Sequence, residues 1–314
     1  MKQLQTLLEW SMQNTTPDSM REYAQQVERG DRPKPSADLL TRGRVITEWD
    51  QLKACVTVLE VPEVQGPEVP ERDRVDEEDR LRAMENLEYL VENLDNANDL
   101  VKLNGIALVQ RYLVHSNPKL RAMAAKIFST CASNNEKFVK QALEFGVPSS
   151  ICQQLRTEND LDVLANLVGC LTSLCTDQSI RPIIVEALGD FVPILLSHSD
   201  STRVITRTLY FLNSLVMGDP SEVPPLLLEG DLLSCVKPYL STETEFVVLE
   251  RALNLCESIV RRGGAKAVDS LQKHIAEEIH AVELPAPKVP GEEDEFSDAR
   301  QYLSVLRMFL SPPS

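Results

Sequence analysis

The sequence has few aromatic residues, which make up 5% of its 314 positions, although hydrophobic residues make up 43%. Its apolar side chains are mostly Leu, Val and Ala, rather than the β-branched and aromatic mixture that is typical of sheets. We therefore predict an all-α chain. The sequence also lacks an uncharged apolar run of the roughly 18 residues that a membrane-spanning helix needs, so no such span is expected.

Basic residues are scarce relative to acidic ones. The chain has 32 Lys and Arg against 48 Asp and Glu, which gives a formal net charge of −16. A nucleic acid or an anionic membrane surface would meet net repulsion, so neither is expected as a partner. Charge effects reach only about 8 Å at cellular salt, and a local basic patch can still select an acidic partner surface.

Cysteine occurs at seven positions, an odd number, and most of them fall in apolar helical patterns where a free thiol packs as a small hydrophobe. This usage indicates a reducing compartment. The first 14 residues carry Glu9 inside their apolar stretch and lack a small-residue cleavage site, so they make a poor secretory signal. We expect the protein in the cytosol, with the nucleus open as a second compartment.

Motifs of catalytic chemistry are missing from the sequence. It has no phosphate-cradling glycine loop, no nucleophile elbow and no metal-ligand quartet. Cys170 and Cys175 stand five positions apart, which suits neither one helical face nor a zinc knuckle, and the four histidines stand singly. We therefore predict a protein that is not an enzyme and that needs no cofactor or metal.

An internal repeat is present instead. Four glycines, each after a short apolar helical segment, are spaced by 41, 43 and 41 residues: Gly105, Gly146, Gly189 and Gly230. Eleven residues after each glycine stands a residue that favours helix N-caps or turns, namely Ser116, Thr157, Asp200 and Ser241. Each unit thus contains a short helix, a glycine turn, a second short helix, a polar loop and a long helix. This is the three-helix pattern of the armadillo repeat.

The long helices are predicted at residues 79–97, 120–133, 161–176, 203–217 and 246–262. Three of these long helices each carry a pair of apolar residues at equivalent positions, three residues apart, as a buried helix face requires. The pairs are Phe128 and Cys131, Leu171 and Leu174, and Leu212 and Leu215. Stacked units would bury these faces and form a right-handed superhelix whose long helices line a concave side.

We expect four segments along the chain. Residues 1–36 form a flexible N-terminal segment with a short amphipathic helix, and residues 37–78 contain a capping helix, at 37–59, and a solvated Pro/Glu loop at 61–76. Residues 79–262 form the armadillo repeats. Residues 263–314 form a helical C-terminal cap, in which Gly263 and Gly264 end the last long helix, a helix covers about 265–282 and a final helix covers about 292–310.

Mostly polar or small residues line one face of the predicted long helices, where packing does not require them. They form four triplets: Met123, Lys126 and Thr130; Asn166, Gly169 and Ser173; Arg207, Tyr210 and Ser214; Arg251, Asn254 and Ser258. We hypothesise that this face is a protein-binding groove. Arg207 and Tyr210 are its best anchors, since Arg and Tyr are enriched in binding hot spots. An ordinary solvated helix face is the alternative for any one of these residues.

Two stretches of sequence carry a family resemblance. The run LVENLDNANDL at residues 90–100 and the run LLEWS at residues 7–11, together with the armadillo units, resemble the heat shock protein 70 binding proteins of animals and their fungal counterpart Fes. That family consists of nucleotide exchange factors for the cytosolic heat shock protein 70 chaperone. The resemblance implies a monomer whose concave face embraces one lobe of the chaperone's nucleotide-binding domain and favours a conformation that holds ADP poorly.

The resemblance also implies roles for particular residues. Ala97 and Arg207 should contact the chaperone lobe, and the flexible N-terminal segment should help to free the chaperone's substrate. The further partner-binding candidates are Asn93, Asn96 and Asn98 in the asparagine run and Lys126, Asn166, Tyr210 and Asn254 on the long helices, while Leu7, Leu8 and Trp10 belong to the releasing segment. The chain departs from the family in its long Pro/Glu loop and in lacking an N-terminal glycine-rich tract. A generic armadillo adaptor without exchange activity is the alternative, although nuclear-signal carriers use concave tryptophans and both tryptophans here precede the repeats.

Overall fold

The computed structural model describes residues 47–71, 74–218, 223–286 and 294–310, and within these ranges every regular element is a helix. The chain divides into two compact units, residues 1–108 and 109–314. The predictions for residues 1–46, including those for Leu7, Leu8 and Trp10, lie outside the described residues. None of the helices in the described ranges has the length and apolar character needed to cross a membrane.

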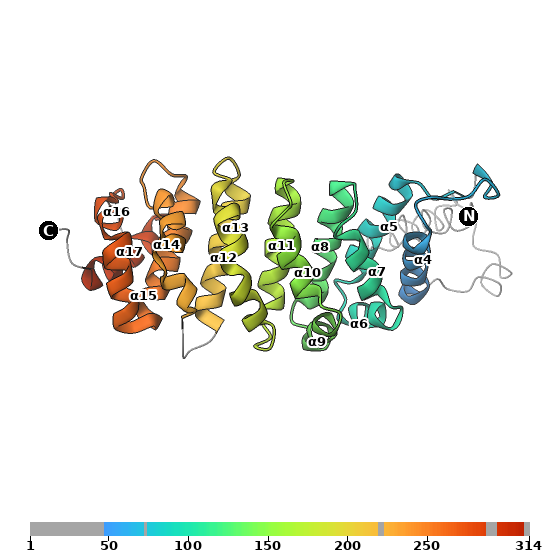
Figure 1. Cartoon of the computed structure of the whole chain (residues 1–314), viewed down its shortest axis with the longest axis horizontal. Coiled ribbons are helices and arrows are strands. Elements are labelled where there is room, and N and C mark those ends of the chain that lie inside the picture. The colour runs from blue at the N-terminus through green and yellow to red at the C-terminus, as the bar shows by residue number, and fades with distance from the viewer. Residues whose placement is uncertain (1–46, 72–73, 219–222, 287–293, 311–314) are drawn as a thin grey trace, which may run out of the picture. The chain divides into compact units, whose positions relative to one another are not determined.

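The first unit contains α4 (Glu48–Glu60), α5 (Glu77–Leu90) and α6 (Leu94–Lys102), followed by the start of α7 (Gly105–Tyr112) (Figure 1). Thr47 and Asp50 form a capping box on α4, and Asp76 and Asp79 form another on α5. In each box the side chains satisfy backbone N–H groups that a helix N-terminus leaves unpaired.

The prediction of one long helix at 79–97 is wrong, because the chain turns after Leu90 and starts a second helix. Asn93 is the N-cap of this second helix, α6, and its side chain accepts a hydrogen bond from the backbone N–H of Asp95. Asparagine is among the best N-cap residues, so it favours a new helix start over continuation of the old one.

The segment between α4 and α5 was expected to be a solvated loop, yet it is anchored to the first unit. The Gln65 side chain donates to the carbonyl of Val75 at 2.7 Å and accepts from the N–H of the same residue at 3.0 Å. The Arg80 guanidinium donates to the carbonyl of Pro62. Val75 is buried, whereas most of the loop's other residues are exposed or half-buried.

The second unit is built from two layers of helices. One layer is a row in which each long helix packs on the next: α8 (Pro118–Ala132), α11 (Leu161–Leu174), α13 (Thr202–Gly218), α15 (Phe246–His274) and α17 (Ser297–Phe309). The other layer contains α10 (Val147–Leu155), α12 (Arg181–Ser197) and α14 (Gly230–Val236) (Figure 1). Shorter elements connect them: α9 (Glu136–Glu144), the 3-10 turns Pro225–Leu228 and Lys237–Tyr239, and α16 (Ala276–Ala281).

The apolar positions that repeat along the long helices form the core of this unit. All six predicted core residues, from Phe128 to Leu215, are at most 1% exposed. Burying one large apolar side chain stabilises a fold by roughly 1.5–3 kcal/mol. The predicted buried face is thus confirmed.

The glycines do not all act as predicted. Gly146 has a φ of 69° and precedes α10, as expected of a turn. Gly189, however, lies inside α12, so the two short helices of that repeat are merged into one. Gly264 has a φ of 61° and a ψ of −151°, which breaks the helical geometry near the predicted end of the last long helix. The chain then continues as a helix to His274. This helix is shorter than the one predicted at about 265–282, because a second break at Ile275 separates it from α16.

The final helix begins later than predicted, at Ser297. Asp294 precedes it, accepts a hydrogen bond from the N–H of Phe296 and forms an ion pair with Arg300. Phe296 packs on Phe246 with ring centroids 4.4 Å apart, which fixes this entry against the first turn of α15. Glu292 and Glu293, the two acidic residues directly before Asp294 in the sequence, lie outside the described residues.

Candidate protein-binding surface

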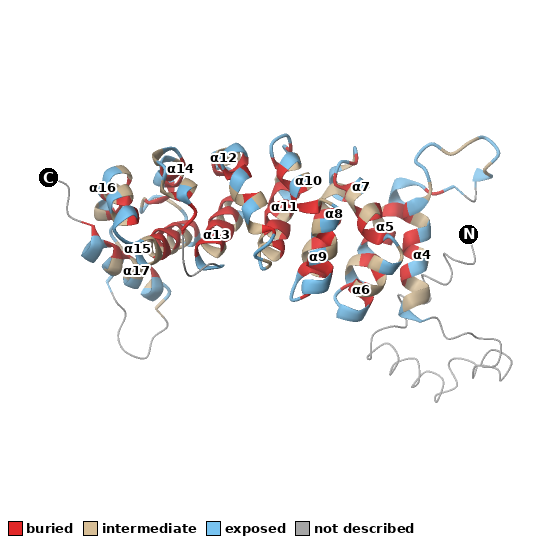
Figure 2. Cartoon of the chain, turned by 60° about the horizontal axis from the view of Figure 1, so that its bottom comes forward, coloured by how far each residue is buried: buried red, intermediate tan, exposed pale blue. Residues whose placement is uncertain are grey.

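The four predicted triplets lie on α8, α11, α13 and α15, and we call their combined surface the long-helix face. Along these helices, buried residues alternate with partly exposed ones (Figure 2). Lys126 and Tyr210 are exposed, Asn166, Arg207 and Asn254 are half-buried, and Ser258 is buried. The structure therefore leaves all the predicted partner-binding residues of these helices at least partly accessible.

Arg207 is held in place by the neighbouring helix α11. Its Nη1 donates to the Ala165 carbonyl at 2.7 Å and to Asn166 Oδ1 at 3.0 Å. Gly169 stands next to the same guanidinium, and a Cβ at this position would lie 3.4 Å from Nη1. Partial burial lowers the pKa of Arg207, and the nearby Arg203 charge acts in the same direction. Arg207 thus braces α13 on α11 while keeping part of its charged group at the surface.

Arg203 joins the same network one turn earlier. It donates to Asn166 Oδ1 at 3.2 Å and forms a salt bridge with Asp162. The guanidinium groups of Arg203 and Arg207 therefore share the Asn166 amide oxygen, and the Asp162 carboxylate forms its salt bridge with Arg203. Both ends of the salt bridge are well exposed, at 49% for Arg203 and 75% for Asp162.

The next pair of helices carries an aromatic contact. The Arg251 guanidinium lies over the ring of Tyr210, 5.6 Å from its centroid, which is within the range of a cation–π interaction. Tyr210 still exposes 51% of its surface. A rigid aromatic ring that is braced on one side and open on the other suits a binding anchor.

The asparagine run has a structural role in the first unit. Asn96 is buried and donates to Glu48 Oε2 at 2.7 Å and to the Leu90 carbonyl at 2.9 Å. Ala97 is 1% exposed, so its side chain packs inside the first unit and has no surface to offer a partner. Asn93 is exposed and Asn98 is half-buried, with its side chain donating to the Leu94 carbonyl. The run therefore builds the corner between α5, α6 and α4.

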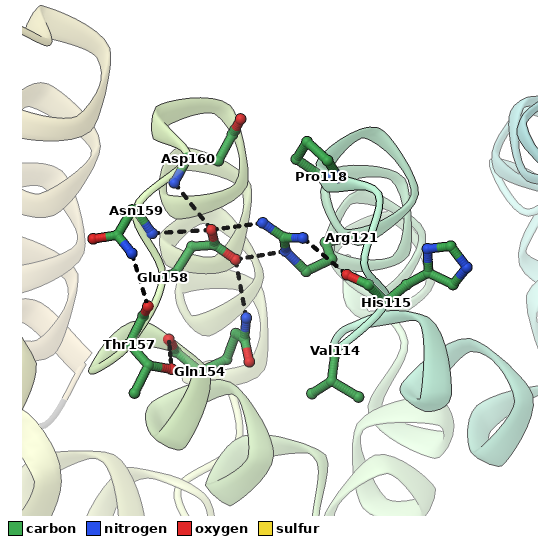
Figure 3. A pocket seen from close by; sticks show the side chains of 9 residues that line it. All are labelled: Val114, His115, Pro118, Arg121, Gln154, Thr157, Glu158, Asn159 and Asp160. Atoms are coloured by element: carbon green, nitrogen blue, oxygen red, sulfur yellow. Dashed lines mark hydrogen bonds and ion pairs between the residues drawn. The ribbon is translucent and has the colours of Figure 1, made fainter.

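One feature of the second unit was not found from the sequence: an ion pair between α8 and the loop that leads into α11 (Figure 3). Arg121 donates from Nε and Nη2 to the two carboxylate oxygens of Glu158, at 2.7 and 2.8 Å. Glu158 also accepts bonds from the N–H groups of Asn159 and Asp160 and from the Gln154 side chain. The pair lines an open hollow of about 550 Å³.

This ion pair is a structural clasp rather than a ligand site, because its polar groups satisfy one another. Burial alone would raise the pKa of Glu158, but the hydrogen bonds from Arg121, Asp160, Gln154 and Asn159 outweigh it and lower the pKa to about 2. A hint was available in the sequence, since Glu158 lies in the polar loop before a predicted long helix. The distance of 37 positions from Arg121 hides the pairing.

The thiols and the other candidate metal ligands form no site in the described ranges. All seven cysteines are free, and burial raises the pKa of Cys55 and Cys256 to about 12. No group of three or more His, Cys, Asp or Glu side chains in the described part of the chain is placed to hold a metal ion.

Comparison with known proteins shows which proteins this chain is similar to. Residues 4–100 match the family model described as nucleotide exchange factor Fes1, a stretch that includes the asparagine run. The Saccharomyces cerevisiae protein named Hsp70 nucleotide exchange factor FES1 is 25% identical over 270 residues, which are 83% of this chain and 87% of the yeast protein. The chain is therefore similar to Fes1 proteins, through the family model over residues 4–100 and through the yeast protein over most of its length.

Other relatives match over a shorter stretch. Human Hsp70-binding protein 1 is 27% identical over 186 residues, which are 58% of this chain and 51% of the human protein. The Gibberella zeae FES1 protein is 34% identical over 102 residues, which are 32% of this chain and 48% of that protein. The matched region thus spans about half the length of the animal relative.

Solved structures with the predicted architecture resemble this chain. The designed armadillo repeat protein YIII(Dq)4CqI superposes with a TM-score of 0.62 at 16% identity, covering 83% of this chain and 100% of the designed one. At that identity the likeness concerns the fold alone. The predicted all-α armadillo fold is confirmed.

Proposed function

We propose that this chain is an adenyl-nucleotide exchange factor that binds the nucleotide-binding domain of cytosolic heat shock protein 70 and promotes ADP release. The match of residues 4–100 to the Fes1 family is the observation that carries this proposal. The long-helix face supports it, because it presents partly exposed polar and aromatic side chains that neighbouring helices hold in place.

Nucleotide release in this proposal is a shift of populations and needs no chemistry from the chain. A partner changes a conformational equilibrium only by the difference between its affinities for the two states. Moving an equilibrium from 1:99 to 99:1 takes a preference of about 10⁴-fold. The long-helix face would therefore have to fit an open arrangement of the chaperone's lobes better than the closed one, and the chain would act as a monomeric binding protein, not as an enzyme.

The proposed contacts differ between the two units. On the second unit they come from Lys126, Asn166, Arg207, Tyr210 and Asn254. On the first unit Asn93 and Asn98 are the available side chains, while Asn96 and Ala97 position the α6 corner from inside. A role of Leu7, Leu8 and Trp10 in freeing the chaperone's substrate remains part of the proposal, as does a location in the cytosol and the nucleus.

The test is the release of a fluorescent ADP analogue from purified cytosolic heat shock protein 70, with and without a stoichiometric amount of the full chain. We expect a faster release with the chain and a much smaller acceleration with an Arg207→Ala, Tyr210→Ala double variant. Release at the unassisted rate with the wild-type chain would refute the exchange activity and leave a protein-binding adaptor.

A further inference from the structure

Asp162, Arg203 and Arg207 form a cluster with two positive charges and one negative charge on α11 and α13. The two guanidinium groups are brought together by Asn166, whose Oδ1 accepts a hydrogen bond from each of them. Arg207 is fixed further by the Ala165 carbonyl, whereas Arg203 reaches outward to Asp162. The only carboxylate in the cluster is therefore its most exposed member.

Further basic side chains lie on the long helices to either side of the cluster. Lys126 is exposed on α8, and Arg251 lies against Tyr210 on the next helix. Glu245, at the N-cap of α15, accepts a hydrogen bond from the Thr202 hydroxyl next to Arg203, whereas Glu250 and Glu257 of α15 lie beside Tyr302 of α17. The long-helix face thus has a basic stretch on a chain whose formal net charge is −16. Such a stretch selects an acidic surface, because the rest of the molecule repels one.

We infer that Arg203 and Arg207 form a binding site for a carboxylate of the partner protein, and that Asp162 occupies the outer side of this site in the free chain. Guanidinium groups bind carboxylates through paired N–H donors in a fixed planar geometry, which makes two adjacent arginines a specific receiver for an Asp or Glu side chain. Asp162 is then an internal competitor: the partner's carboxylate must displace it or share the two arginines with it.

This inference rests on the proposed function for the identity of the partner. It predicts that loss of the Asp162 carboxylate strengthens binding of the partner. Loss of an ordinary interface side chain weakens binding, but loss of a competing carboxylate strengthens it. Exposed ion pairs are weak, so removing the competition should tighten binding by about two- to fivefold.

The chain offers a matched control for this experiment. Asp190 on α12 forms an exposed salt bridge with Arg156, with side chains 54% and 46% exposed, in the helix layer that lies away from the long-helix face. Asp162→Asn and Asp190→Asn change the net charge equally, so an effect of net charge alone would be the same in both variants. Arg203→Gln and Arg156→Gln form the corresponding pair of arginine variants.

Affinity for ADP-bound cytosolic heat shock protein 70 would be measured by biolayer interferometry at low and at physiological salt, after circular dichroism has shown that each variant is folded. We expect Asp162→Asn to bind about two- to fivefold tighter than Asp190→Asn at low salt, with a smaller gap at higher salt. Arg203→Gln should bind several-fold more weakly than Arg156→Gln. Equal affinities within each pair would overturn the inference, even when the wild-type chain accelerates ADP release.

A second probe keeps the inference testable should the wild-type chain not bind the chaperone. A fluorescein-labelled octaglutamate peptide, with octaglutamine as its control, would be titrated at low salt and followed by anisotropy. Stronger octaglutamate binding by Asp162→Asn than by Asp190→Asn then supports the carboxylate site while the exchange function falls. Indistinguishable binding by the two variants then rejects the site together with the function.

Discussion

The Arg121–Glu158 clasp should contribute substantially to the stability of the second unit at neutral pH. Glu158 is 6% exposed and its pKa falls from 4.5 to about 2, with burial opposing the shift and the four hydrogen-bond donors producing it. One pKa unit corresponds to about 1.4 kcal/mol, so the ionised carboxylate contributes at most about 3 kcal/mol. Glu158→Gln keeps the size of the side chain but removes the charge that Arg121 needs.

We expect Glu158→Gln to lower the free energy of unfolding by about 2–3 kcal/mol at pH 7, measured by urea titration with circular dichroism. The sign of the pH dependence follows from the lowered pKa. The contribution is complete above the unfolded pKa near 4.5 and is lost as the pH falls through the folded pKa of about 2. The difference between wild type and variant should therefore shrink between pH 5 and the most acidic pH at which both still fold.

The control is Glu144→Gln, which removes an exposed carboxylate of α9 in the same unit and should change the stability by less than about 0.5 kcal/mol. An Arg121→Gln, Glu158→Gln double variant completes the cycle and isolates the coupling between the two side chains. A wild-type advantage over Glu158→Gln that stays constant from pH 7 to the acidic limit would refute the assignment of the stability to the ionised clasp.

Three further changes test other parts of the structure. Asn96→Ala removes two hydrogen bonds that tie α6 to α4 and to the end of α5, so it should destabilise the first unit by about 1–3 kcal/mol and speed amide hydrogen exchange in α4. Asn98→Ala, at a half-buried position, should have a far smaller effect. Equal exchange rates in the two variants would contradict this role of Asn96. Gly189→Ala should raise the free energy of unfolding by up to about 1 kcal/mol, because the residue lies within a helix and a Cβ there meets only ordinary contacts. Gly264→Ala should lower the free energy of unfolding by about 1–3 kcal/mol because of its φ of 61°. Melting curves of the two variants that shift in the same direction would be inconsistent with the geometry. Tyr210→Phe keeps the ring that Arg251 covers and should leave chaperone affinity within about twofold, while Tyr210→Ala should weaken it by about 1 kcal/mol or more in titration calorimetry; equal losses would point to the hydroxyl instead.

The repeat was predictable from the sequence because each copy has to bury the same helix face. Phe128 and Leu171 occupy equivalent positions in successive repeats, and such periodicity survives even where the remaining residues have diverged. Helix ends were less predictable where a residue could either end one helix or allow it to continue. Asn93 ends one helix by starting another, and Gly189 continues a helix where the other repeats turn, since glycine permits a turn without requiring one.

The surface could be predicted as a face, but the bonds within it could not. Helical spacing alone placed Arg207 and Tyr210 on the same side of their helix. The contacts of Arg207 with Ala165 and Asn166 join residues more than 40 positions apart, and no local pattern encodes such a pairing. The clasp between Arg121 and Glu158 escaped detection for the same reason, whereas the capping role of Asn93 could have been inferred from its position before an apolar helical stretch.

The most recognisable stretch of the sequence includes buried residues at its centre, and this changes how variants of those residues should be interpreted. Asn96 and Ala97 hold the corner of α6 from within, so a bulky or charged residue at position 97 would have to be accommodated in a packed interior. Loss of exchange activity in such a variant would report a displaced corner, and would be accompanied by reduced stability of the first unit. An exposed position such as Asn93, whose side chain only caps the helix, separates the two effects: a substitution by Asp preserves the cap and the fold, so any change in chaperone affinity then reports the surface itself.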